Sequence, residues 1–488
     1  MALLTPDRGV DARPLPDHAG WGAREMWALG ISALIGLFVF FWRLTTPSVV
    51  NDEVIYRAAA SQYLEGVFVL NPEHPPLAKF LIGAGQALLG GGLFADRFAG
   101  ALLGFLTGML VVATAYIVGR SSRAAVLAGL LWWLLPIAPG MIHLHVARAV
   151  TLEGPMLFFL AAATLAATLA ARDDRMRWYL AAGALAGLAA ACKLTGVVAV
   201  AALLPVALQQ RHALRRTAGR AAAAAGVFVL AFLLPYAPLG DQATNVLRQT
   251  FVFQLGHVAD GHPQTVAGTV YQHQPWWSPF WFQAQYLGWP ALFALFTLAA
   301  TGVVLLRGHR SLWPSAAVLA AGLLIVCTSP IKLPQYQGIW APALCVLAGA
   351  AVAGAVRQGG SGERGRGLLS RRLVLALLVP LAVAGAGQVG SVATEQVEDY
   401  RAAGAFLAER VPPGVPITIW GDQGALGVVL PDHPLPEPLP PDGLPVALVV
   451  DPTIADRRPN EDVARWSAQY GSDYEIYRFQ RLTVYLRR

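Results

Sequence analysis

Apolar stretches long enough to cross a lipid bilayer recur along this chain, and they limit its fold more than any other feature. The first covers residues 26–44, and about twenty consecutive apolar residues suffice for one crossing. Charged residues make up 13% of the 488 positions, against about a quarter in a soluble globular protein. Mean hydropathy is +0.51. We therefore predict a polytopic α-helical membrane protein.

The apolar runs predict about eleven transmembrane helices inside a membrane domain of residues 26–391. The expected spans are residues 26–44, 97–118, 124–142, 152–171, 178–191, 195–209, 221–238, 286–306, 313–329, 338–356 and 373–390. Two long loops, 45–95 and 240–285, interrupt them. The first loop contains helical patterns at 52–64 and 75–90. The second pattern is short for a span, so we expect that helix to lie on the membrane surface.

Arginine marks one side of the membrane. The N-terminal tail (1–25) is arginine-bearing, and so are the turns that fall on the same side, at 120–123, 172–177, 211–220, 307–310 and 357–372. The positive-inside rule makes this side the cytoplasm. Both long loops then lie outside. Because the net charge of +7 reports topology, it does not predict a nucleic-acid partner.

The C-terminal segment 392–488 has a different pattern. Residues 400–410 predict an amphipathic helix, and the stretches 417–420, 446–450 and 482–486 predict strands. We expect a small extracytoplasmic α/β domain.

An acidic pair, Asp52-Glu53, follows the first span directly, and a His74-Pro-Pro turn closed by Lys79 ends the same loop. Acids at a helix N-terminus are favoured by the helix dipole, which is the simpler explanation. The functional explanation is a general base at the membrane surface, with neighbouring charges tuning its pKa.

The chain has three lysines, Lys79, Lys193 and Lys332, and the predicted topology puts all of them at the outer surface. Snorkelling explains one such lysine easily. All three together favour cations that converge on an anionic lipid head group, most simply a phosphate. Arg148 is a fourth candidate, and Glu153 is either its ion-pair partner or a functional intramembrane acid.

Metal binding has little support in the sequence. Cys192, Cys327 and Cys345 all fall in apolar stretches, which predicts neither a structural disulfide nor a cysteine metal cluster. No two histidines have the spacing of a zinc-binding helix. We expect no certain cofactor, with a divalent metal ion as a minor alternative.

Four motifs together resemble the protein O-mannosyltransferases and the bacterial aminoarabinose transferases, which belong to the GT-C superfamily of membrane glycosyltransferases. The motifs are Asp52-Glu53 with His74-Pro75-Pro76-Leu77-Ala78-Lys79, Ala147-Arg148 with Glu153-Gly154-Pro155, Cys192-Lys193-Leu194-Thr195-Gly196, and Lys332-Leu333-Pro334-Gln335-Tyr336. The resemblance covers roughly residues 26–390. It departs from the family at Ala78, usually Gly, and at Glu153, usually Asp.

The resemblance implies a GT-C fold and an inverting transfer of mannose or a related hexose from a polyprenyl-phosphate donor, on the outer face of a bacterial plasma membrane. By carry-over, Asp52 is the catalytic base beside Glu53. Arg148, Lys193, Lys332 and Lys79 bind the donor or its lipid phosphate. His74, Glu153 and Tyr336 support the site. The acceptor is a protein, lipid or glycan hydroxyl.

Two other function classes remain as alternatives. A transporter or flippase for a lipid-linked solute would place its site near the bilayer midplane, often in repeated halves. The charges here lie at the outer edge, and no repeat is evident. A membrane-anchored scaffold for the small domain would leave the loop at 45–95 unexplained.

Overall fold

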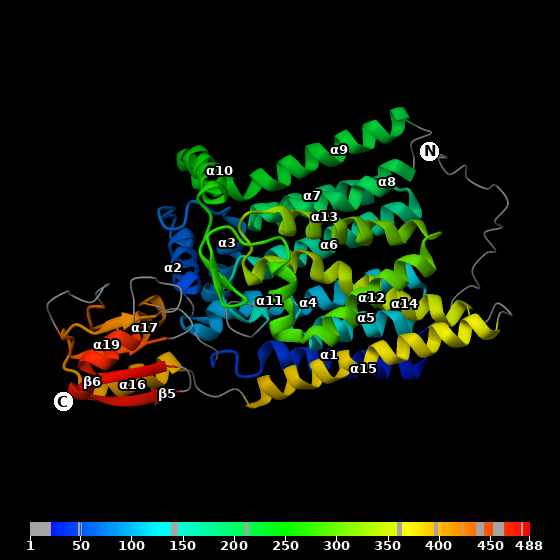
Figure 1. The fold of residues 1–488 in the computed structure, drawn as a ribbon. Helices are drawn as coiled ribbons and strands as arrows, with labels where there is room; N and C mark the ends of the chain where they lie inside the picture. Colours follow the sequence, from blue (N-terminus) through cyan, green and yellow to red (C-terminus); the bar gives the residue numbers. More distant parts are fainter. Residues whose placement is uncertain are drawn as a thin grey trace.

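The computed structural model describes residues 21–46, 49, 51–137, 145–209, 214–358, 364–394, 399–421, 423–435, 444–451, 463–479 and 482–488. Within these ranges, eight helices are long and apolar enough to cross a membrane, and four shorter apolar helices accompany them. Figure 1 shows the long helices side by side in one bundle. The chain is therefore a polytopic helical membrane protein.

The bundle consists of helices of very different burial. Its elements are α1 (Ala23–Phe41), α4 (Leu93–Gly119), α5 (Ser122–Leu134), α6 (Glu153–Asp173), α7 (Met176–Cys192), η2 (Leu194–Leu203), α8 (Leu204–Gln209), α9 (Leu214–Leu233), α12 (Trp289–Leu306), α13 (Trp313–Thr328), α14 (Ala341–Gln358) and α15 (Arg364–Thr394). In the most apolar 18-residue stretch of the span that contains α14, 89% of the residues are buried. In the corresponding stretch of α1, 22% are buried. Helix α14 is thus central, and α1 faces outward.

Small residues let neighbouring helices approach closely, as is usual in membrane bundles. A side chain added at Gly187 of α7 would collide with the carbonyl oxygen of Phe228 on α9. Likewise, a side chain at Gly302 of α12 would collide with the carbonyl of Leu347 on α14. The alanine- and glycine-rich composition of these segments is therefore a packing requirement.

Several segments differ from the sequence-based expectation. Residues 194–203 form η2, a 3₁₀ helix, in the first part of the expected α-helical span 195–209. Helix α15 begins at Arg364, inside the segment 357–372 expected to be an arginine-rich turn. The outer loop 240–285 is largely ordered, with η4 (Leu234–Gln242), α10 (Ala243–Asp260), the hairpin β1 (Gln264–Val266) and β2 (Thr269–Tyr271), and α11 (Ser278–Leu287). Two 3₁₀ segments, η5 (Arg310–Leu312) and η6 (Pro334–Trp340), precede α13 and α14.

Helices α2 (Asn51–Leu64) and α3 (Leu77–Leu89) confirm the two helical patterns predicted in the first loop. Together with α10, they lie at one end of the bundle (Figure 1). Helix α3 buries Ala78, Lys79 and Ile82 and exposes Leu88. The surface position of α3 in the membrane stays a prediction.

The C-terminal segment lies beyond the same end of the bundle (Figure 1). Its sheet has the order β3-β4-β6-β5, with β3 (Thr418–Trp420) parallel to β4 (Ala447–Val450) and the other pairs antiparallel. Strand β6 (Leu482–Arg487) matches a predicted strand, whereas β5 (Tyr474–Phe479) was not predicted. The described part of this segment also contains helices α16 (Asp399–Arg410), α17 (Gln423–Val429) and α19 (Val463–Tyr470), and the short 3₁₀ turn η7 (Gly471–Asp473).

Candidate active site

Asp52 lies in the first turn of α2, half-buried, and faces groups from three distant segments. It is within electrostatic range of Lys193, Glu153 and His262. Glu153, in the first turn of α6, forms an ion pair with the Lys193 ammonium group, and both side chains are buried. The Lys193 Nζ atom lies 4.6 Å from the ring centroid of Tyr336. The structure thus brings four of the predicted site residues together.

Burial raises the pKa of the Asp52 carboxyl above its ordinary value. Lys193 opposes this shift and Glu153 reinforces it, while His262 also lowers the pKa. Burial makes the negative charge of a carboxylate harder to keep than it is in water, and here this effect exceeds the opposing attraction of Lys193. A carboxylate with a raised pKa is a stronger base.

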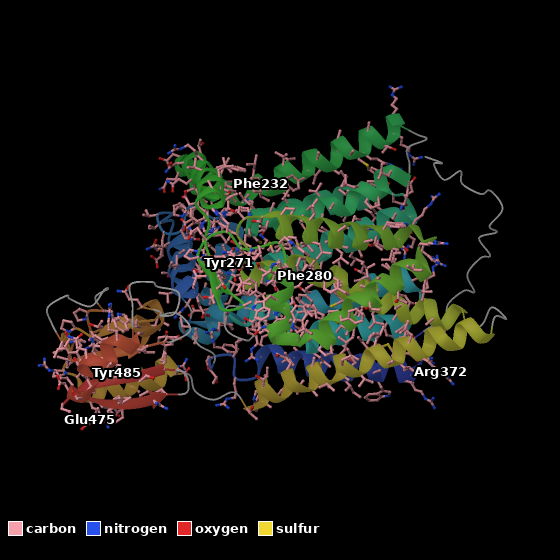
Figure 2. The ribbon with its side chains drawn as sticks, in the orientation of Figure 1. Phe232, Tyr271, Phe280, Arg372, Glu475 and Tyr485 are labelled. Carbon is pink, nitrogen blue, oxygen red and sulfur yellow. The ribbon has the colours of Figure 1, made fainter. Side chains whose placement is uncertain are left out.

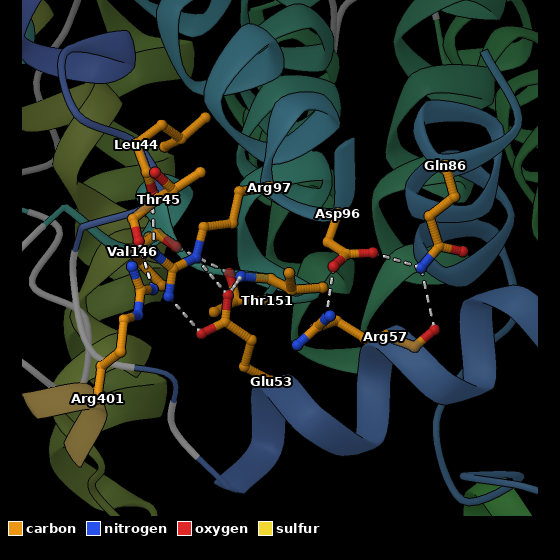
Figure 3. A network of polar contacts seen from close by, with 11 residues as sticks. Leu44, Thr45, Glu53, Arg57, Gln86, Asp96, Arg97, Val146, Thr151 and Arg401 are labelled. Carbon is orange, nitrogen blue, oxygen red and sulfur yellow. Dashed lines mark hydrogen bonds and ion pairs between the residues drawn. The ribbon is translucent and has the colours of Figure 1, made fainter. Parts of the chain in front are cut away.

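Glu53 points away from Asp52's neighbours and into the protein, where it meets Arg97 of α4. The Arg97 Nε atom lies 2.6 Å from Glu53 Oε1 and Nη2 lies 2.8 Å from Oε2, with both side chains fully buried. Arg97 also donates to the Leu44 carbonyl, and Glu53 accepts from the Val150 amide. Figure 3 shows this network joining the end of α1, α2 and α4.

A second ion pair on the next turn of α2 strengthens the same junction. The Arg57 Nε atom lies 2.5 Å from Asp96 Oδ2, and Gln86 of α3 donates both to Asp96 and to the Arg57 carbonyl (Figure 3). Sequence reasoning missed Arg97 and this pair. The available signal was the adjacent Asp96-Arg97 at the start of an apolar span, since such charges are costly without partners.

The His74-Pro-Pro turn is fastened by Lys79. Its buried ammonium group donates to Tyr63 Oη at 3.0 Å, to the His74 carbonyl at 2.9 Å and to the Asn71 carbonyl. Burial lowers the Lys79 pKa to about 7. The His74 ring packs between Tyr56 and Phe253, and burial together with Lys193 and Lys79 lowers its pKa well below the usual value.

The remaining predicted cations bond to main-chain carbonyls. Arg148, fully buried, donates to the carbonyls of Val39 and Trp42 at the end of α1, at 2.7 and 2.9 Å. The Lys332 Nζ atom donates to the Gln274 carbonyl at 2.6 Å and to that of Ser329. This geometry favours positioning roles for Lys79, Arg148 and Lys332. Of the four predicted cations, Lys193 is the one that pairs with Glu153 and lies within electrostatic range of Asp52.

No three His, Cys, Asp or Glu side chains within the described ranges are grouped so that they could hold a metal ion.

Comparison with solved structures identifies the fold. The crystal structure of apo ArnT from Cupriavidus metallidurans superposes with a TM-score of 0.60 at 17% identity, over 95% of this chain and 98% of that one. An archaeal oligosaccharyltransferase from Archaeoglobus fulgidus gives a TM-score of 0.54 at 13% identity, over 84% of this chain and 64% of that one. Sequence profiles of the dolichyl-phosphate-mannose-protein mannosyltransferases match residues 30–93 and 73–238.

The chain shares the fold of these two structures.

Among curated sequences, this chain is 32% identical to the polyprenol-phosphate-mannose–protein mannosyltransferase of Mycobacterium tuberculosis over 42% of its length and 44% of the relative. It is 34% identical to a dolichyl-phosphate-mannose–protein mannosyltransferase of Candida albicans over 29% of its length and 18% of the relative. The chain thus spans less than half the length of these curated relatives.

Proposed function

We propose that this protein is a GT-C glycosyltransferase. It would transfer a sugar, mannose or a related hexose, from a polyprenyl-phosphate donor to an acceptor hydroxyl on the side of the membrane opposite the arginine-rich turns. The observation that supports this most is the convergence of Asp52, Glu153, Lys193 and Tyr336 at one end of the bundle. The names of the mannosyltransferase relatives support the donor class.

In the proposed reaction, Asp52 accepts the proton of the acceptor hydroxyl. The acceptor oxygen forms a bond to the anomeric carbon while the bond from that carbon to the phosphate oxygen breaks. The electron pair of the broken bond stays on the lipid phosphate, and a single displacement inverts the anomeric centre. Stabilising the charge that develops on the phosphate is the larger electrostatic requirement.

Lys193 is the cation we assign to that phosphate. Glu153 and the Tyr336 ring hold its ammonium group in place before the donor binds. Glu53 and Arg97 fix the direction of α2 and therefore of Asp52, while Lys79, Arg148 and Lys332 fix the surrounding backbone. The His74 ring packs against Tyr56 and Phe253 and has a structural role. We leave the acceptor as a hydroxyl of a protein, lipid or glycan.

The test is transfer from synthetic polyprenyl-phosphate-mannose to membrane-extract acceptors by the purified protein. We expect transfer by the wild type and a loss of about 10²- to 10⁴-fold in Asp52→Asn, the range for a general base, with donor binding retained. Asp241→Asn, an exposed aspartate outside the cluster, is the matched control. Full transfer by Asp52→Asn would exclude Asp52 as the base.

A second variant pair tests the phosphate assignment. Lys193→Gln combined with Glu153→Gln removes both charges of the pair, so no buried charge is left alone. We expect this double variant to weaken donor binding at least tenfold. Unchanged binding of the donor would contradict the role of Lys193.

A further inference from the structure

A recess of about 440 Å³ lies between α1, α5, α14 and α15, far from the candidate active site. Its charged residues come from the first turns of two helices, Arg24 and Glu25 on α1 and Arg123 on α5. Its apolar residues include Val126 and Leu130, one and two turns further along α5, and Leu378 of α15. The recess therefore has a charged mouth and an apolar interior.

The mouth lies on the arginine-rich side of the bundle. Arg372, near the start of α15, marks this end in Figure 2, at the opposite end from the C-terminal sheet with its labelled Glu475 and Tyr485. Helices α1, α14 and α15, which line the recess with α5, are long and apolar enough to cross a membrane. We therefore expect the recess to open at the level where lipid head groups meet acyl chains.

The mouth carries a net positive charge. Arg24 and Arg123 contribute two guanidinium groups, and Glu25 contributes one carboxylate. The Arg123 Nε atom lies 3.7 Å from Glu25 Oε1, and the Arg123 side chain is 70% exposed. Such a distance is too long for a strong hydrogen bond. The donor groups of Arg123 are thus largely available, and the Arg24 side chain is also exposed.

We propose that this recess binds an anionic glycerophospholipid. Its phosphate would lie between Arg24 and Arg123, and one acyl chain would lie along Val126, Leu130 and Leu378. Arginine suits this ligand because its planar group pairs with phosphate through two parallel hydrogen bonds. Basic pockets between transmembrane helices at the membrane surface are a known form of head-group recognition. A zwitterionic lipid would bring its own cation to an already positive mouth, so the charge selects an anionic head group.

The test measures the retention of defined lipids by the detergent-purified full chain with native mass spectrometry. We expect more dioleoylphosphatidylglycerol than dioleoylphosphatidylcholine to remain bound at equal concentration. Arg24→Gln should weaken phosphatidylglycerol binding about fivefold and Arg24→Gln with Arg123→Gln about thirtyfold, if each arginine contributes the usual electrostatic attraction. Arg215→Gln, an exposed arginine on the same side but outside the recess, should change nothing.

A second variant tests the interior without altering any charge. Leu130→Trp fills the apolar part of the recess and keeps both arginines, so phosphatidylglycerol binding should also fall. Inorganic phosphate should fail to compete at millimolar concentration, because it cannot use the apolar interior. Equal retention of the two lipids would overturn the proposal. So would wild-type retention of phosphatidylglycerol by both the double arginine variant and Leu130→Trp.

Discussion

The cationic side chains at the end of the bundle that holds the candidate active site fall into two groups, which differ in the kind of group they bind. Lys193 and Arg97 pair with carboxylates, Glu153 and Glu53. Lys79, Arg148 and Lys332 bond to backbone carbonyls. The first arrangement fixes charges relative to one another, and the second fixes loops and helix ends relative to the bundle. Asp52 lies within electrostatic range of the Lys193–Glu153 pair.

The raised pKa of Asp52 predicts the pH dependence of transfer. The base is active as the carboxylate, so activity should rise as pH increases through its pKa. Because burial raises that pKa, the acidic limb of the kcat/KM profile should lie above the usual range for an aspartate. A profile that stays flat down to pH 4 would contradict this. The residual activity of Asp52→Asn should lack the limb.

Breaking the Glu53–Arg97 ion pair should lower the unfolding free energy substantially, and a second substitution should recover part of the loss. Glu53→Gln leaves the Arg97 charge buried without its partner, which typically costs about 3–5 kcal/mol of unfolding free energy. Denaturant unfolding in detergent measures it. The double variant Glu53→Gln with Arg97→Met removes both charges and should recover part of the loss. Additive losses in the double variant would show that the two side chains are not coupled.

Sequence motifs located Asp52, Glu153, Lys193 and Tyr336, and the structure brings these together. The pairings themselves could not be predicted, because they join residues that are distant along the chain, such as Glu53 and Arg97. Sequence also could not show that Lys79, Arg148 and Lys332 turn toward carbonyls. Every loop offers carbonyls, and they leave no pattern in the residue types. The predicted phosphate contacts of these three cations stay predictions.

Among the elements, α7 and α9 depend on glycine for their contact. Gly187→Ala should lower stability by about 1–3 kcal/mol, the usual cost of overpacking, because the new methyl group meets the Phe228 carbonyl. Gly226→Ala on α9 has no neighbour within 4 Å and should be neutral or slightly stabilising. Thermal unfolding of the two variants in the same detergent separates these outcomes. Equal shifts would show that the contact is not close.

Hydropathy predicted well where helices occur, but it did not predict the type of helix or the residues at which helices begin and end. The run at 195–209 is apolar at nearly every position. It therefore has no period that could distinguish an α-helix, with about 3.6 residues per turn, from a 3₁₀ helix, with about 3.0. The start of α15 at Arg364 was hidden by arginines and glycines, which resemble a linker. The hairpin β1–β2 was missed because two three-residue strands are too short for a period-two pattern.

At the scale of the whole molecule, the predicted topology can be tested by cysteine labelling. Ser472→Cys in the C-terminal segment should react with a membrane-impermeant maleimide in intact cells, whereas Gly308→Cys should react only after lysis. Both positions are exposed. Of the native cysteines, Cys192 and Cys345 are buried, so the remaining Cys327 is replaced first. Labelling of Gly308→Cys in intact cells would reverse the assignment.

The C-terminal segment rests directly on the elements that hold the active site. Helix α17 packs against α2, and Arg401 of α16 donates to the Thr45 carbonyl at 2.7 Å (Figure 3). The segment therefore contacts the helix that presents Asp52. An acceptor that binds to this segment would be held beside Asp52, the proposed base.

The carbonyl contacts of Lys332 have a consequence for how its charge is held. Its Nζ atom donates to the carbonyls of Gln274 and Ser329, and a carbonyl dipole stabilises a cation without cancelling its charge. An anionic group that approaches this side chain would therefore meet a cation already held in place. That attraction should weaken as added salt shortens its range.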